Sequence, residues 1–139
     1  MNNPELTTLN TNVVREVAKS VSSPWERIVM QFEIMDLPDS RAHNEFSIIV
    51  QKDSSDKHSV SNFRLSDDAK AALLKLRDAN VSESGDKWST CLLIIDPPGK
   101  FKFDFSYDEP KVLNGILDEE YKYYRKYLPH YLKEKGLAQ

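Results

Sequence analysis

Apolar and polar positions alternate most regularly near the end of the chain, in the stretch "KFKFDFSY" at residues 100–107. Side chains alternate between the two faces of a strand, so Lys102, Asp104 and Ser106 lie opposite the aromatic residues. An apolar run at 88–95 precedes it, and "DPPG" at 96–99 is a turn signal, with proline and glycine suited to the centre of a type II turn. The pattern predicts a β-hairpin with a wet face, and with Phe101, Phe103 and Phe105 in the core.

The same alternation predicts a second hairpin in the first half of the chain. Within residues 25–36, one face is expected to carry Ile28, Met30, Phe32 and Ile34. A polar turn follows, and residues 45–52 can pair back as the next strand. Residues 57–65 are a weaker strand candidate.

Three other segments have helical spacing. In residues 5–22, one apolar stripe consists of Leu6, Leu9, Val13, Val17 and Val21. Ser66 followed by two aspartates is typical of a helix start, because the hydroxyl can cap free backbone amides and acids suit the positive end of the helix dipole. After Pro110 the pattern becomes helical again, and Pro129 should kink or restart that helix.

These elements follow one another in the order α-β-β-(β)-α-β-β-α. Short turns between successive strands favour antiparallel pairing. We therefore expect a single α+β domain over residues 1–139: an antiparallel sheet of four to five strands with an N-terminal helix, a central helix and C-terminal helices packed on one sheet face.

Composition narrows the class of protein. The 139 residues are 40% hydrophobic and 29% charged, with a net charge of -3. No global positive field would gather nucleic acid, and no apolar run approaches a membrane span. The start of the chain lacks the features of a secretory signal, and a single cysteine suits a reducing compartment. We expect a cytoplasmic protein.

Candidate chemistry is sparse. His43, His58 and His130 lack metal-ligand spacing and are expected to be exposed. Cys91 is expected to be a small core residue, although a nucleophilic pair with His58 remains the alternative. We predict no catalytic residues, no metal and no cofactor.

Two groups of residues suit a binding surface. Carboxylates occur at strand ends, and such acids either keep a protein soluble or contact a partner. In the tail "YKYYRKYLP", Tyr121, Tyr124 and Leu128 share one helical line and are expected in the core. Tyr123 and Tyr127 lie on a neighbouring line beside basic residues, where tyrosines can bind nucleic acid or serve in a protein interface.

Three motifs in this order resemble the YezG-like family of bacterial immunity proteins. They are the tryptophan and Gly-Lys-Phe turn of "WSTCLLIIDPPGKFKFDFSYDEP", the strand end "DFSYD" within it, and the tail "YKYYRKYLP". The stretch "SPWERI" after the first helix adds to the match, which covers nearly the whole chain. One departure is that the second helix is less acidic than in several relatives.

The resemblance implies a non-enzymatic antitoxin that binds and neutralises a cognate toxin, often a nuclease, in the producing cell. Trp25 and Trp88 would then hold the fold. Complementary charge speeds association with a basic partner, so we expect clustered acids at one end of the sheet to contact the toxin. The predicted toxin-binding residues are Asp36, Asp39, Asp104, Asp108, Glu109, Tyr123 and Tyr127. The partner would be the C-terminal domain of the toxin, with no direct binding to nucleic acid or membrane. A domain that binds a different protein is the alternative function.

Overall fold

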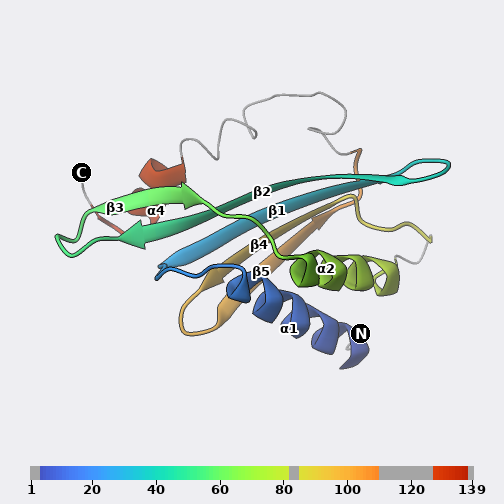
Figure 1. Cartoon of the computed structure of the whole chain (residues 1–139), viewed down its shortest axis with the longest axis horizontal. Helices are drawn as coiled ribbons and strands as arrows, with labels where there is room; N and C mark the ends of the chain where they lie inside the picture. Colours follow the sequence, from blue (N-terminus) through green and yellow to red (C-terminus); the bar gives the residue numbers. More distant parts are fainter. Residues whose placement is uncertain (1–3, 82–84, 110–126, 138–139) are drawn as a thin grey trace.

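The computed structural model describes residues 4–81, 85–109 and 127–137, and shows an α+β fold (Figure 1). The helices and strands in chain order are α1 (Pro4–Lys19), β1 (Arg27–Asp36), β2 (Arg41–Lys52), β3 (His58–Asn62), α2 (Asp67–Ala79), β4 (Thr90–Asp96), β5 (Lys100–Ser106) and α4 (Tyr127–Glu134). This order confirms the predicted fold class.

All five strands form one antiparallel sheet in the order β3-β2-β1-β4-β5. The two predicted hairpins are therefore both present, and they meet because β1 pairs with β4, where Phe32 lies opposite Cys91. The long central strand β1 is buried along nearly its whole length, as expected for a strand that is paired on both sides and covered on both faces.

Helices α1 and α2 cover one face of this sheet. The core between them contains the predicted β1 stripe from Ile28 to Ile34, together with Val13 and Val17 of α1 and Leu73 and Leu76 of α2. Trp88 is fully buried in this core and Trp25 packs against it, as the resemblance implied. The predicted helix start is also confirmed, because the Ser66 hydroxyl accepts a hydrogen bond from the Ala69 amide at 3.1 Å.

Helix α4 lies on the opposite face, which corrects the expectation that all helices would share one face (Figure 1). It forms a second core in which Tyr127, Tyr131 and Leu132 pack against Val29 and Val50. Val29 of β1 and Phe46, Ile48 and Val50 of β2 make this part of the second face apolar too, so both faces of the sheet can be buried there. Pro129 lies in the first turn of α4, where a proline breaks no helical hydrogen bond.

The second hairpin differs from prediction in two details. Phe103 and Phe105 are partly buried against the first core, but Phe101 is 45% exposed because β5 is the edge strand and the core does not extend that far. The turn is also not a type II turn. The Pro97–Pro98 bond is cis, and the Gly99 amide donates to the Asp96 carbonyl at 3.1 Å.

Candidate protein-binding surface

The sheet has two chemically different ends, which the strand register defines. At one end lie the β1–β2 turn and the end of β5, because Glu33 pairs with Thr90 and Thr90 pairs with Ser106. We call it the acidic end and define it by Asp36, Asp39, Asp108 and Glu109. At the other end lie the start of β1 and the β4–β5 turn, as Ile28 pairs with Ile95. The register thus brings four of the five predicted acids to the same end. Figure 1 shows this end at the right, where the β1–β2 hairpin projects.

The carboxylate of Asp36 is bound by two arginines. It accepts from Arg77 at 3.1 Å and 3.2 Å and forms an ion pair with Arg41 at 3.3 Å. The hydrogen bond from Arg77 holds the pKa of Asp36 below its ordinary value. Arg77 is itself buried and donates to the Trp88 carbonyl at 2.7 Å. Asp36 therefore fastens α2 to the end of β1, which is a structural role.

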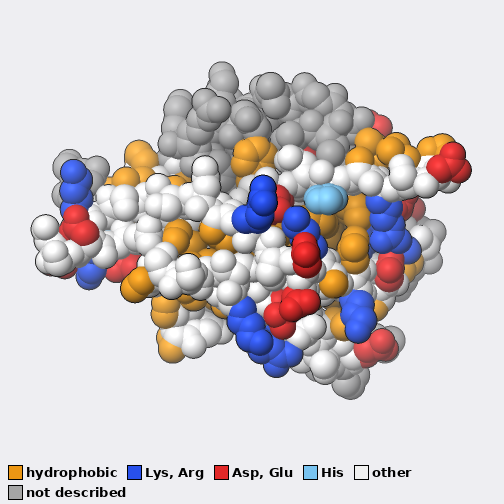
Figure 2. Space-filling view, in the orientation of Figure 1, with side chains coloured by type: hydrophobic (Ala, Val, Ile, Leu, Met, Phe, Trp, Pro, Cys, Tyr) orange, Lys and Arg blue, Asp and Glu red, His pale blue; other side chains and the backbone are white. Residues whose placement is uncertain are grey.

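Asp39 lies at the tip of the β1–β2 hairpin. The Leu37 amide donates to the Ser40 carbonyl at 2.8 Å, so Pro38 and Asp39 form the short connecting loop. Leu37 is 42% exposed beside it. Figure 2 shows hydrophobic and acidic side chains together on the projecting hairpin at the right of the view. An exposed apolar side chain next to a carboxylate is a combination that suits contact with another protein.

The end of β5 is held in place by Ser89. Its hydroxyl donates to the main-chain oxygens of Ser106 and Asp108, and the Ser89 amide also donates to the Ser106 carbonyl at 2.8 Å. These bonds hold the backbone and leave the side chains of Asp108 and Glu109 exposed. Within the described residues, no ion pair or side-chain hydrogen bond involves the carboxylates of Asp39, Asp108 or Glu109. Tyr107 is 47% exposed next to them.

Asp104 does not join the acidic end, because its row crosses the sheet through Leu92 and Gln31, in the middle of β1, so the predicted cluster of five is only partly correct. It pairs with Leu92, whose side chain packs in the second core, and it therefore lies on the α4 face of the sheet. Asp36 lies on the opposite face, where it meets Arg77 of α2. The alternation that places the aromatic residues of β5 toward α1 and α2 turns Asp104 the other way.

Tyr127 is not a surface residue, which corrects its assignment to the toxin contact. Only 2% of it is exposed, and its hydroxyl accepts from Arg27 at 3.0 Å. Tyr127 packs in the second core against the sheet. Leu128, from the line that was assigned to the core, packs there too but is only partly buried. Tyr123 lies outside the described residues, as do Tyr121 and Tyr124.

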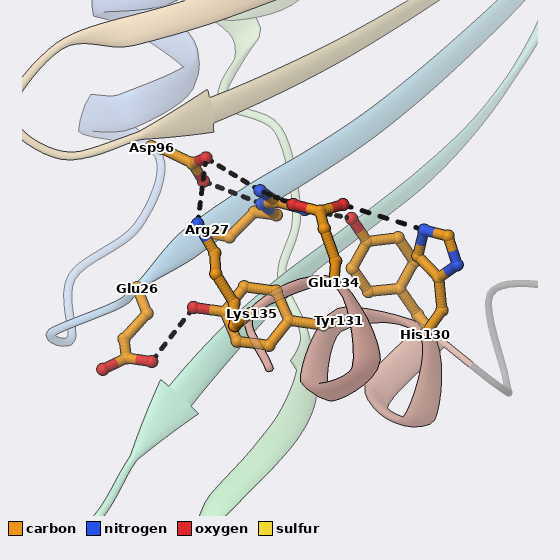
Figure 3. A network of polar contacts seen from close by, with 8 residues as sticks. Glu26, Arg27, Asp96, His130, Tyr131, Glu134 and Lys135 are labelled. Atoms are coloured by element: carbon orange, nitrogen blue, oxygen red, sulfur yellow. Dashed lines mark hydrogen bonds and ion pairs between the residues drawn. The ribbon is translucent and has the colours of Figure 1, made fainter. Parts of the chain in front are cut away.

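At the opposite end of the sheet, which we call the closed end, Arg27 binds Asp96 and Glu134 (Figure 3). This buried guanidinium donates to both carboxylate oxygens of Asp96 at 2.7 Å and 2.8 Å, and to both of Glu134 at 3.1 Å and 2.6 Å. Its pKa is raised, first by the hydrogen bond to Asp96, while the same arginine lowers the pKa of Asp96 and of Glu134. Lys135, whose ammonium lies 3.8 Å from Asp96, supplies a second positive charge, so the two cations balance the two carboxylates and join β1, the end of β4 and α4.

Aromatic contacts complete this closed end. The Arg27 guanidinium lies 5.0 Å from the centre of the Tyr131 ring, and the Tyr131 hydroxyl donates to Glu26 at 3.1 Å. Burial, and then the bond to Glu26, raises the pKa of Tyr131 to about 12. Glu26 also contacts His58 at 2.8 Å, so His58 is largely buried rather than exposed as predicted. His43 and His130 are exposed, as expected.

The pair of Cys91 and His58 does not form. Cys91 is fully buried in the α1–α2 core, whereas His58 meets Tyr131 on the α4 side. Burial, with a smaller contribution from Asp104, raises the pKa of the Cys91 thiol far above its ordinary value, which disfavours the nucleophilic thiolate. Among residues 4–81, 85–109 and 127–137, no group of three histidine, cysteine or carboxylate side chains is arranged to hold a metal ion.

Three residues of these two ends were absent from the predicted set. Leu37 stands alone among polar turn residues in "MDLPDS", and an isolated apolar residue in a turn is a usable signal for surface contact. Arg27 opens the apolar run "RIVM", and a charge there indicates a buried ion pair. Arg77 carries no such signal, because it resembles any basic residue near the C-terminal end of a helix.

Comparisons with known proteins identified no family and no relative, so the inference of function depends on the structure and the sequence motifs. No known family model matches the chain, and no curated protein resembles it closely enough to count as a relative. Of the helices in the described part of the chain, none is both long and apolar enough to span a bilayer.

Proposed function

We propose that this chain is an immunity protein, which binds and neutralises a cognate bacterial toxin in the cytoplasm of the cell that makes both. We take a nuclease as the toxin class. The observation that carries the proposal is the acidic end, where Asp39, Asp108 and Glu109 are exposed without a compensating charge among the described residues, beside exposed Leu37 and Tyr107. The motif resemblance to YezG-like immunity proteins points the same way.

The physical argument rests on charge and on shape. A nuclease binds a polyanion, so its cleft is basic, and exposed carboxylates accelerate its encounter with an inhibitor. The acids alone would raise the association rate constant without adding much affinity. Exposed Leu37 and Tyr107 supply apolar area that can be desolvated at the centre of a contact, with the acids at its rim. Asp36 does not belong to the contact, because its two arginines already neutralise it.

The decisive experiment is a pull-down of the tagged protein from its native cell. Recovery of the C-terminal domain of a large toxin, bound one to one and inactive, would establish the class. Recovery of a protein with no toxic activity would favour the alternative, a general interaction domain. If no partner is recovered, the resemblance describes the fold alone.

The role of the acidic end is tested on the recovered toxin domain. The paired change Asp108→Asn and Glu109→Gln removes two negative charges. We expect the association rate constant to fall several-fold at low salt, with the difference shrinking as salt screens the charges.

The matched control is Ser54→Lys with Ser59→Lys. It shifts the net charge by the same amount near the opposite end of the sheet, because Ser54 lies in the β2–β3 turn and Ser59 in β3 just after it. If both pairs slow association equally, only net charge matters, and the acidic end is not the contact.

A further inference from the structure

Strand β5 is an edge of the sheet. Among the described strands it pairs only with β4, so its outer backbone groups have no strand partner there. An unpaired edge is a template for another strand, and proteins usually block it by charge, by a bulge or by covering it. β5 is regular over Lys100–Ser106, with each residue opposite one of β4 and no bulge in the register.

The side chains of this edge form an aromatic ladder on one face. The Phe103 and Phe105 rings stack with their centres 5.4 Å apart, and Phe101 meets Phe103 edge-on at 5.8 Å. Phe101 is 45% exposed, and the other two rings are only partly buried. Aromatic residues in neighbouring strands stabilise a pair, so this ladder would gain from a further strand beside it.

On the opposite face of β5, which begins with Lys100, the two residues next to Phe103 carry opposite charges. Lys102 and Asp104 are both exposed, and they pair with Ile94 and Leu92 of β4 on the α4 face. Within the described residues, neither side chain forms an ion pair or a hydrogen bond. An edge protected by repulsion would carry one sign of charge. Here the two signs flank Phe103 symmetrically.

This symmetry indicates that the strand best suited to pair with β5 is β5 of a second copy of the chain. In an antiparallel pair centred on Phe103, each residue number and its partner's add up to 206. Lys102 of each copy then meets Asp104 of the other, and Phe101 meets Phe105, while Phe103 meets itself across the two-fold axis. Opposite charges and aromatic rings placed directly across antiparallel strands are both stabilising pairs. A strand of unrelated sequence would satisfy these positions only by coincidence.

We propose that two copies of this chain associate through β5, forming an isologous dimer in which the two five-stranded sheets become one continuous sheet of ten strands. The pairing covers Asp104 and leaves Asp39, Asp108 and Glu109 at the acidic ends. One dimer would therefore present two separate copies of the proposed toxin-binding surface. The dimer does not depend on the proposed function, and its test requires no toxin.

The test is sedimentation equilibrium of the full chain and of two charge reversals. The wild type should approach twice the 16.0 kDa mass of one chain as its concentration rises. Lys102→Asp places two aspartates opposite two aspartates, and Asp104→Lys does the same with lysines. Each variant alone should raise the dimer dissociation constant about tenfold or more.

Two rescues make the result specific to the proposed register. An equal mixture of the Lys102→Asp and Asp104→Lys variants restores opposite charges in both pairs, so it should form a heterodimer that neither variant forms with itself. The double variant exchanges the two charges and should again form a homodimer of near wild-type affinity. Both sites are exposed, and circular dichroism checks that the fold is retained.

Three outcomes would overturn the proposal. The wild type could remain monomeric up to about 1 mM, in which case the edge serves another partner or none. Both single reversals could leave a dimer intact, which would place the interface elsewhere. The mixture and the double variant could both fail to recover association, which would exclude the pairing of Lys102 with Asp104.

Discussion

The two ends of the sheet use the same residue types for opposite purposes. At the closed end, Asp96 and Glu134 share the buried guanidinium of Arg27, and each accepts two hydrogen bonds from it. At the acidic end, the carboxylates of Asp108 and Glu109 have no such partner among the described residues. The difference lies in the cation: Arg27 is shared by both acids of the closed end, whereas Arg77, the buried arginine of the acidic end, binds Asp36 and forms no ion pair with Asp108 or Glu109 among the described residues.

This contrast separates carboxylates that hold the fold from carboxylates available to a partner. An acid already bound by a guanidinium must give up that pairing before it can contact anything else. An exposed and uncompensated acid pays no such cost. Asp36 shows that a position at the acidic end does not by itself leave a carboxylate available to a partner. It lies at that end but is bound by arginines, as the acids of the closed end are.

The largest expected effect is the loss of Arg27. Arg27→Ala removes the guanidinium that Asp96 and Glu134 share, leaves Asp96 only the longer ion pair with Lys135 at 3.8 Å, and removes the bond to Tyr127. Breaking a fully buried ion pair costs about 3–5 kcal/mol, but here both carboxylates are partly exposed and can hydrate, so we expect about 2–3 kcal/mol. Urea denaturation measures this loss. The control Arg64→Ala removes an exposed arginine and should change the free energy of unfolding by less than about 0.5 kcal/mol. Equal losses in both variants would refute a special role for Arg27.

The second-largest expected effect is a loss of stability at acidic pH, which arises at the closed end. Arg27 lowers the folded-state pKa of Asp96 and of Glu134, so their contribution is complete above the unfolded pKa values and disappears as pH falls through the folded ones. The free energy of unfolding should therefore decrease below about pH 4. Denaturation curves collected from neutral to acidic pH test this. In Arg27→Ala the decrease should be shallower, and an unchanged slope would assign the acid sensitivity to other groups.

A smaller effect is expected from one hydroxyl. Tyr127→Phe removes the acceptor that Arg27 uses at 3.0 Å, while the ring stays in the core, so we expect a loss of about 1 kcal/mol. Tyr107→Phe is the matched control at an exposed position, and its stability should not change measurably. Thermal and urea unfolding of both variants would decide. A toxin affinity that drops only in Tyr127→Phe would contradict the burial of Tyr127.

The smallest effect on stability belongs to the acidic end itself. Asp108→Asn with Glu109→Gln should alter the free energy of unfolding by no more than about 0.5 kcal/mol, because no described residue depends on these carboxylates. Differential scanning calorimetry provides the measurement. A loss as large as that of Arg27→Ala would mean that these acids support the fold, and the contrast between the two ends would fail.

Local sequence determined most of the elements of this fold. Alternation set the faces of β1, since a strand with a period of two can bury Ile28, Met30, Phe32 and Ile34 together only on one side. The Ser66 cap began α2 at the predicted residue, because capping involves atoms only three residues apart. These signals are short-range, because the residues that form the sequence pattern are the same residues that form the strand or the cap.

Tertiary structure decided the features that depend on distant neighbours. Phe101 continues the aromatic alternation, yet it is exposed because β5 became an edge. The acids of the candidate site could be located from strand ends, but strand register and the reach of Arg77 determined which of them remained uncompensated. Arg27 meets Asp96, Tyr127 and Glu134 across 69, 100 and 107 residues. Sequence periodicity alone determined which faces were apolar, but only the folded chain determined which charge lies next to which, because ion pairs act at a few ångströms in space and have no period along the chain.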